Sequence, residues 1–246
     1  MADKRWRLLL YGAPKMGKTT FANTAPGPRL FLDIEGGTDW LPSNIVDWDP
    51  KNPPPTGLTS DDTVVVHVKE WDSIAQANSW LQGGQHEFKS VILDSITEAQ
   101  KVAKRTITDG GMELRDWGRL YDMIDPVLRE LRDLTKHKTN PVWCVVITAL
   151  ANEKDGIIQP DVQGSMARSL AGQIDTIGYL QPSSMNAEGV VGREMVVEPK
   201  STLYAGDRTR TLRRDFGGKV PIDLDADDNL TWNIGQILAH MNGDNQ

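Results

Sequence analysis

Short apolar runs alternate along the chain with longer segments in which apolar and polar residues are mixed. Within the runs the apolar residues are nearly continuous, which is typical of parallel strands buried on both faces of a sheet. The runs are WRLLLY (6–11), RLFLD (29–33), TVVVHV (63–68), SVILD (90–94), VWCVVIT (142–148), DTIGYL (175–180) and EMVVE (194–198). We predict a strand at each of them.

Segments of helical length lie between most of the first five runs, at 71–82, 95–105 and 114–138. This alternation predicts an α/β fold with a mostly parallel central sheet flanked by helices. After about residue 175 the strands follow one another without long helices, so we expect antiparallel strands toward the C-terminal edge. Residues 231–246 are predicted to be a C-terminal helix and tail.

Residues 47–62 contain prolines and a glycine that exclude regular structure, and they are predicted to be a surface excursion. Strands of the same type resume after this excursion, and the chain has no repeat or linker. We therefore predict a single domain over residues 1–246.

The composition is that of an ordinary globular protein, with 39% hydrophobic and 25% charged residues. The formal net charge of −7 means that any contact with nucleic acid must come from local patches. No apolar stretch is long enough for a membrane span or a signal peptide, so we expect a cytoplasmic protein without membrane contact. The single cysteine, Cys144, lies in an apolar run and is expected in the core.

Residues 12–19, GAPKMGKT, fit the phosphate-binding motif G-x-x-x-x-G-K-S/T between a predicted strand and a predicted helix. The glycines let the backbone curl around phosphate oxygens, Lys18 can reach the β- and γ-phosphates, and the Thr19 hydroxyl can bind Mg²⁺. The motif predicts a nucleoside triphosphate site. The candidate nucleotide-binding residues are Gly12, Ala13, Pro14, Lys15, Met16, Gly17, Lys18, Thr19 and Thr20.

Such a site needs a second acid for the metal, at the end of a neighbouring strand. Asp94 ends the run SVILD and is the candidate, although it can also cap the helix that follows. Many P-loop ATPases place a water-activating glutamate directly after this aspartate, where this chain has Ser95. Glu35, two residues beyond the strand-ending Asp33, is therefore the hypothetical base. The alternative, in which both acids only solvate the strand end, stays open.

Two other P-loop enzymes are weighed against the sequence. A GTPase is disfavoured, because DIEG at 33–36 follows the phosphate loop too closely and NEKD at 152–155 has the wrong order for base recognition. A small-molecule kinase needs an arginine-rich lid, for which only DRTRTLRR at 207–214 is available.

The stretches GAPKMGKTTFA, LFLDIEGG, VILDSIT, RDWGRLYD and VVITAL, in this order, resemble the RecA recombinase core. They are most similar to the phage ATPases of the Sak type, RecA cores without flanking domains that anneal single-stranded DNA. The resemblance covers about residues 6–225 and implies a RecA-like ATPase that uses ATP and Mg²⁺. It implies that Glu35 is the catalytic glutamate, that Thr148 lies near the γ-phosphate sensor, and that Lys200 reaches the nucleotide of a neighbouring subunit.

The resemblance also implies single-stranded DNA as partner, a homo-oligomer, and a single-strand DNA-binding protein or helicase as a further candidate partner. DNA-binding loops would lie near 106–117 and 151–172. Four arginines form the densest basic patch, which either contacts DNA, acts across a subunit interface or is a solvated turn. The candidate DNA or interface residues are Trp117, Arg115, Arg168, Arg208, Arg210, Arg213 and Arg214. The main alternative function is a helicase loader or a motor-type ATPase that acts on a protein partner.

Overall fold

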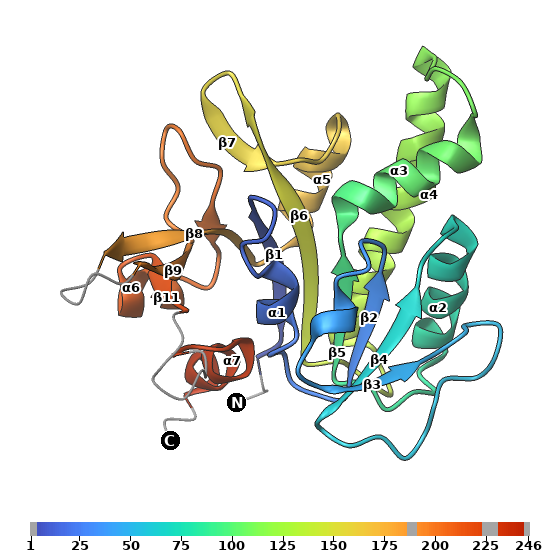
Figure 1. The fold of residues 1–246 in the computed structure, drawn as a ribbon, viewed down its shortest axis with the longest axis horizontal. Helices are drawn as coiled ribbons and strands as arrows, with labels where there is room; N and C mark the ends of the chain where they lie inside the picture. The colour runs from blue at the N-terminus through green and yellow to red at the C-terminus, as the bar shows by residue number, and fades with distance from the viewer. Residues whose placement is uncertain (1–3, 186–190, 223–230, 244–246) are drawn as a thin grey trace.

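The structure is a computed structural model that describes residues 4–185, 191–222 and 231–243. Within these ranges, eleven strands form a sheet in the order β11-β9-β8-β1-β6-β5-β2-β4-β3, with β10 paired to β8 and β7 paired to β6 (Figure 1). The strands are β1 (Trp6–Gly12), β2 (Arg29–Asp33), β3 (Asn44–Asp47), β4 (Asp62–His67), β5 (Ser90–Asp94), β6 (Cys144–Lys154), β7 (Ile157–Pro160), β8 (Thr176–Met185), β9 (Val191–Val196), β10 (Gly206–Asp207) and β11 (Lys219–Pro221). The helices are α1 (Lys18–Ala22), α2 (Trp71–Gly83), α3 (Ile96–Ile107), α4 (Leu114–Asp133), α5 (Ser165–Gln173), α6 (Thr211–Phe216) and α7 (Ile234–Asn242), with 3₁₀ turns η1 (Thr38–Trp40) and η2 (Leu134–Lys136).

The predicted fold class is confirmed. The strands from β3 to β8 in the sheet order pair in parallel, while β8, β9 and β11 pair antiparallel at the C-terminal edge. The predicted C-terminal helix is α7, and none of the described helices is long and apolar enough to cross a bilayer.

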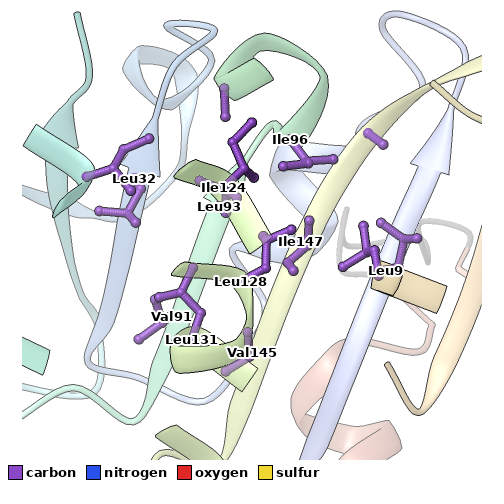
Figure 2. Close-up of a cluster of buried hydrophobic side chains, with 14 of the residues drawn as sticks. Leu9, Leu32, Val91, Leu93, Ile96, Ile124, Leu128, Leu131, Val145 and Ile147 are labelled. Carbon is purple, nitrogen blue, oxygen red and sulfur yellow. The ribbon is translucent and has the colours of Figure 1, made fainter. Parts of the chain in front are cut away.

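The near-continuous apolar runs are explained by two cores, one on each face of the sheet. Leu9 of β1 and Leu32 of β2 point to the face covered by α2–α5 and belong to the same buried cluster as Leu128 of α4 (Figure 2). Leu8 and Phe31 point to the opposite face, which is packed by α1, α6 and α7. Side chains alternate between the two faces along a strand, and both faces are buried here. Successive residues of these strands are therefore apolar. Cys144 is buried in the second core, as expected.

The two predicted loops contain regular structure, about half of the first and most of the second. Residues 106–117 comprise the end of α3, a short connection and the first turn of α4. Residues 151–172 hold the end of β6, strand β7 and most of α5. The β6–β7 turn has positive φ at Asp155 (53°) and Gly156 (74°), the backbone that a two-residue hairpin loop requires. The prediction that residues 151–172 form a loop was therefore wrong.

β6 also does not end at Thr148. It pairs with β5 as far as Ile147 and with β1 as far as Leu150, and then leaves the sheet as one arm of the hairpin with β7. Thr148 lies within this strand and is fully buried. A sequence pattern of continuous apolar residues cannot show such a change of partner, because it records burial and not pairing.

Candidate nucleotide site

The phosphate loop joins β1 to α1 and is shaped by its two glycines. A Cβ atom at Gly12 would lie 2.7 Å from the carbonyl oxygen of Leu180 on β8, so no side chain fits there. Gly17, which caps α1, has a φ of +83°, a left-handed conformation that favours glycine. The Lys18 ammonium donates to the carbonyl oxygens of Gly12 (3.2 Å) and Ala13 (2.9 Å), so it lies across the loop. Burial lowers the pKa of Lys18, and the carboxylates of Glu35 and Asp94 oppose that shift.

Asp94 lies at the end of β5, beside the loop, and its side chain is 1% exposed. The Thr19 hydroxyl donates to its Oδ2 (2.7 Å), and the Thr148 hydroxyl donates to its Oδ1. Burial raises the pKa of Asp94; these two hydrogen bonds oppose the rise, and Glu35 and Asp33 add to it. The fold thus brings together three predicted site residues from α1, β5 and β6, over long distances in the sequence.

Glu35 and Asp33 have different surroundings. Asp33 is buried and accepts hydrogen bonds from the backbone N–H of Gly36 (2.8 Å) and the hydroxyl of Thr38 (2.6 Å), so it holds the turn that follows β2. The exposed Glu35 side chain accepts a hydrogen bond from the Ser95 hydroxyl. Glu35, which follows the neighbouring strand β2, therefore contacts Ser95, the residue directly after Asp94. Many P-loop ATPases have their glutamate at this position of the sequence.

The donor atoms around Thr19 fit Mg²⁺. This ion prefers hard oxygen ligands and is usually bound by one or two protein groups together with substrate phosphates. The Thr19 hydroxyl and the Asp94 carboxylate converge next to the phosphate loop, and Gly37 packs so closely on Thr19 that a Cβ there would lie 3.1 Å from the hydroxyl. Among the described residues, no group of three or more His, Cys, Asp or Glu side chains is arranged to hold a metal by itself. Any Mg²⁺ here would thus depend on phosphate ligands.

One residue at the loop was missed by sequence reasoning. Arg193, on β9, places Nη1 3.5 Å from the Met16 carbonyl oxygen and 2.3 Å from where a Cβ atom of Gly17 would be. No local pattern could have found it, because its approach depends on the pairing of β9 with β8.

Two of the candidate DNA residues, Trp117 and Arg168, line clefts next to the β6–β7 hairpin. Trp117, on α4, is 40% exposed and lines a cleft of about 690 Å³ whose other walls are the hairpin and residues 161–164. Arg168, on α5, lines a smaller neighbouring cleft of about 300 Å³. Arg115 is exposed and pairs with Glu113 at 3.2 Å. Parts of both predicted DNA-binding segments thus meet around one cleft.

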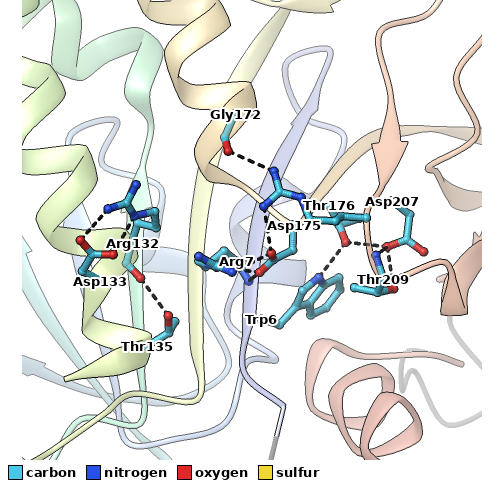
Figure 3. Close-up of polar contacts among 11 residues, drawn as sticks. Trp6, Arg7, Arg132, Asp133, Thr135, Gly172, Asp175, Thr176, Asp207 and Thr209 are labelled. Atoms are coloured by element: carbon cyan, nitrogen blue, oxygen red, sulfur yellow. Dashed lines mark hydrogen bonds and ion pairs between the residues drawn. The ribbon is translucent and has the colours of Figure 1, made fainter. Parts of the chain in front are cut away.

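The other candidates lie on the far side of β1. Arg208 lies 3.8 Å from Asp175, which Arg7 of β1 also binds (Figure 3). Arg213 and Arg214 pair with nearby acids, Glu198 at 2.9 Å and Asp215 at 2.5 Å. Within the described ranges Arg210 is exposed and makes no ion pair, and the exposed Lys200 exchanges backbone hydrogen bonds with Leu203.

A phosphate loop between the first strand and helix of a parallel sheet, with an acid at the end of a neighbouring strand, defines a P-loop nucleotide-binding ATPase. The chain matches the family model described as an AAA domain over residues 4–209, and it belongs to this family of AAA-type P-loop ATPases. Members of the family generally use ATP and Mg²⁺. No curated protein matches the chain.

Proposed function

We propose that the protein is a Mg²⁺-dependent, RecA-like ATPase that binds single-stranded DNA and anneals it during recombination, like the phage ATPases of the Sak type. The observation that carries the DNA part of this proposal is the cleft bounded by both predicted DNA-binding segments, with an exposed tryptophan in its wall. The ATPase part is supported by the family match and by the arrangement of residues around the phosphate loop.

In the proposed site, residues 12–19 hold the triphosphate, and Lys18 binds the β- and γ-phosphates. Thr19 and Asp94 hold Mg²⁺, which would neutralise charge on the phosphates. Glu35 orients the attacking water and accepts its proton, while the Ser95 hydroxyl fixes one carboxylate oxygen of Glu35. Thr148 orients the Asp94 carboxylate through its hydrogen bond.

The cleft has the features that single-stranded nucleic acid needs. Trp117 offers an exposed ring on which a base can stack, and the Lys104 ammonium lies 4.8 Å from the ring centroid. Lys104 and Arg105, at the end of α3, line a second cleft of about 420 Å³ and add local positive charge to an acidic protein. Asp155, Asp161 and Lys154 also line the main cleft, so its own lining has no excess of positive charge and stacking would contribute more to affinity than charge.

The test is to measure ATP turnover with and without single-stranded DNA, DNA binding by gel shift at low salt, and the oligomeric mass. We expect stimulation by DNA and a homo-oligomer. Trp117→Ala should weaken DNA binding about 5- to 100-fold, the loss of about 1–3 kcal/mol of stacking, without changing turnover in the absence of DNA. Trp117→Phe should recover most of the affinity. The control is Leu114→Ala, which removes a 91% exposed apolar side chain from the same turn of α4.

The second candidate function keeps the ATPase and replaces DNA with a protein, as in a helicase loader or a motor-type ATPase. The highly exposed Leu114 beside Trp117 favours it, because an apolar side chain of this kind suits a protein contact. Turnover that does not respond to DNA, together with no gel shift at low salt, would contradict annealing and favour this alternative.

A further inference from the structure

The β8–β9 hairpin stands directly beside the phosphate loop. β8 pairs in parallel with β1, and Gly12, where the loop begins, lies opposite Leu180. Two residues further along β8, Pro182 lies opposite Arg193 of β9 in the antiparallel register. Figure 1 shows β8 and β9 next to β1, on the side away from β5 and β2. The hairpin therefore approaches the loop from the side opposite Asp94 and Glu35.

Both glycines of the loop are in contact with this hairpin. A Cβ atom at Gly12 would meet the Leu180 carbonyl oxygen, and a Cβ atom at Gly17 would lie 2.3 Å from Nη1 and 3.5 Å from Cζ of Arg193. The Arg193 guanidinium thus lies against the Cα atom of Gly17, at the point where α1 begins. Any side chain at position 17 would clash with the guanidinium, so this contact requires glycine there.

This position would let the guanidinium reach a phosphate bound in the loop. The first N–H groups of a helix have no partner within the helix, and in a phosphate loop they face the α- and β-phosphates. These N–H groups carry partial positive charge, and a guanidinium beside them adds to that charge. A phosphate group between them would be bound by both, with the planar guanidinium donating to its oxygens.

We propose that Arg193 is a phosphate ligand that acts within its own subunit and binds the α- or β-phosphate of the nucleotide at Gly17. This inference rests on the proposed nucleotide site at residues 12–19. Lys18 would bind the terminal phosphates, while Arg193 holds the inner ones from the β9 side. The role differs from that expected for Lys200, which would reach the nucleotide of a neighbouring subunit.

The experiment is a titration of the full chain with fluorescent ATP, ADP and AMP analogues in the absence of DNA. Arg193→Ala should weaken binding of ATP and ADP to the same extent, about 10- to 100-fold, as expected for a lost charge-assisted hydrogen bond. The loss for an adenosine analogue without phosphate should be negligible, which a merely structural role would not produce. Arg193→Lys should recover part of the affinity. The matched control is Lys219→Ala, which removes a cation from the neighbouring strand β11 without touching the loop.

Several results would overturn the inference. ATP and ADP affinities unchanged in Arg193→Ala, while Lys18→Ala abolishes binding, would leave the nucleotide site intact and remove Arg193 from it. Tighter binding in Arg193→Ala would make Arg193 an obstacle to phosphate and not a ligand. A loss for ATP alone would move its contact to the γ-phosphate. If Lys18→Ala also binds ATP normally, the proposed site itself is wrong. Should Arg193→Ala not fold, Arg193→Gln gives the same comparison.

Discussion

Asp33 and Asp94 lie opposite each other in the register of β2 and β5, and both are buried, yet their environments predict opposite responses to the same substitution. Asp94 accepts two side-chain hydroxyl groups and lies near other carboxylates, whereas Asp33 accepts several backbone N–H groups of the turn after β2. We predict that Asp94→Asn raises the free energy of unfolding and that Asp33→Asn lowers it, in the absence of nucleotide and Mg²⁺.

The magnitude for Asp94 follows from two opposing effects. Removing a carboxylate from water costs several kcal/mol, and two hydrogen bonds to the charged group offset about 1.5–3 kcal/mol each. Asparagine keeps one acceptor, and its NH₂ group can donate to the other hydroxyl. Without the buried charge, we expect Asp94→Asn to gain about 1–2 kcal/mol, which raises the melting temperature by roughly 2–8 °C for a chain of this size.

For Asp33 the same substitution removes acceptors that nothing replaces. In either orientation the NH₂ group of asparagine would face backbone N–H donors that now donate to Asp33, those of Glu35 and Gly36 on one side or that of Thr38 on the other. Losing about two charge-assisted hydrogen bonds lowers the free energy of unfolding by about 3 kcal/mol.

Urea denaturation with EDTA at pH 7.5 and pH 5 checks both values. Because the pKa of Asp94 is raised in the folded state, that state binds the proton more tightly than the unfolded chain does. The carboxylate therefore lowers stability above the ordinary pKa range, and the advantage of Asp94→Asn should shrink as the pH falls. A loss of stability in Asp94→Asn at pH 7.5, similar to that of Asp33→Asn, would refute the reasoning and make Asp94 an ordinary structural acid.

Glu35→Gln keeps an acceptor for the Ser95 hydroxyl but cannot take a proton, so ATP turnover should fall at least about 100-fold while ATP affinity is retained. Unchanged turnover in a phosphate-release assay would exclude Glu35 as the base. Burial lowers the pKa of His86 from 6.5 to about 4, so the unfolded chain binds a proton there before the folded state does, and stability is lost as the pH falls through this range. Between pH 7 and pH 4.5 the free energy of unfolding of the wild type, measured with urea, should fall by about 2 kcal/mol more than that of His86→Phe, which preserves the stacking on Phe88. Parallel pH profiles of the two proteins would show that His86 does not cause the loss.

The sequence predicted those parts of the fold that depend on local pattern. The apolar runs identified β1, β2, β4, β5, β6, β8 and β9, and the motif GAPKMGKT identified the phosphate loop. The loop prediction over 151–172 failed although a signal was present, since the dipeptide Asp155-Gly156 between extended segments is typical of a two-residue hairpin. β3 gave no such signal, because its residues are exposed or only half-buried and it is recruited to the sheet by pairing with β4.

Site residues could be predicted where parallel strand pairing alone brings them close to one another. Glu35 follows the run RLFLD and Asp94 ends the run SVILD, and the carboxyl ends of parallel strands meet at one edge. The hydrogen bonds of Thr148 to Asp94 and of Ser95 to Glu35 needed the register, which no local pattern contains. Arg193 needed more: the pairing of β8 with β1, the first strand of the chain, and the return of the antiparallel strand β9 to the loop.

The proposed nucleotide site would have acids on the side of the parallel strands and Arg193 on the side of the β8–β9 hairpin. The two sides come from different parts of the sheet. The parallel side gathers Asp94, Asp33 and Glu35 so closely that the two other acids raise the pKa of Asp94. A basic side chain on this side would pair with the acids and would not be available to phosphate. Mg²⁺ differs, because it can bind carboxylate and phosphate oxygens at the same time. The antiparallel β8–β9 hairpin is the element that brings a cationic side chain to Gly17 from the other side. An arginine introduced among Asp33, Glu35 and Asp94 should not restore ATP binding to Arg193→Ala, because it would form an ion pair with these acids.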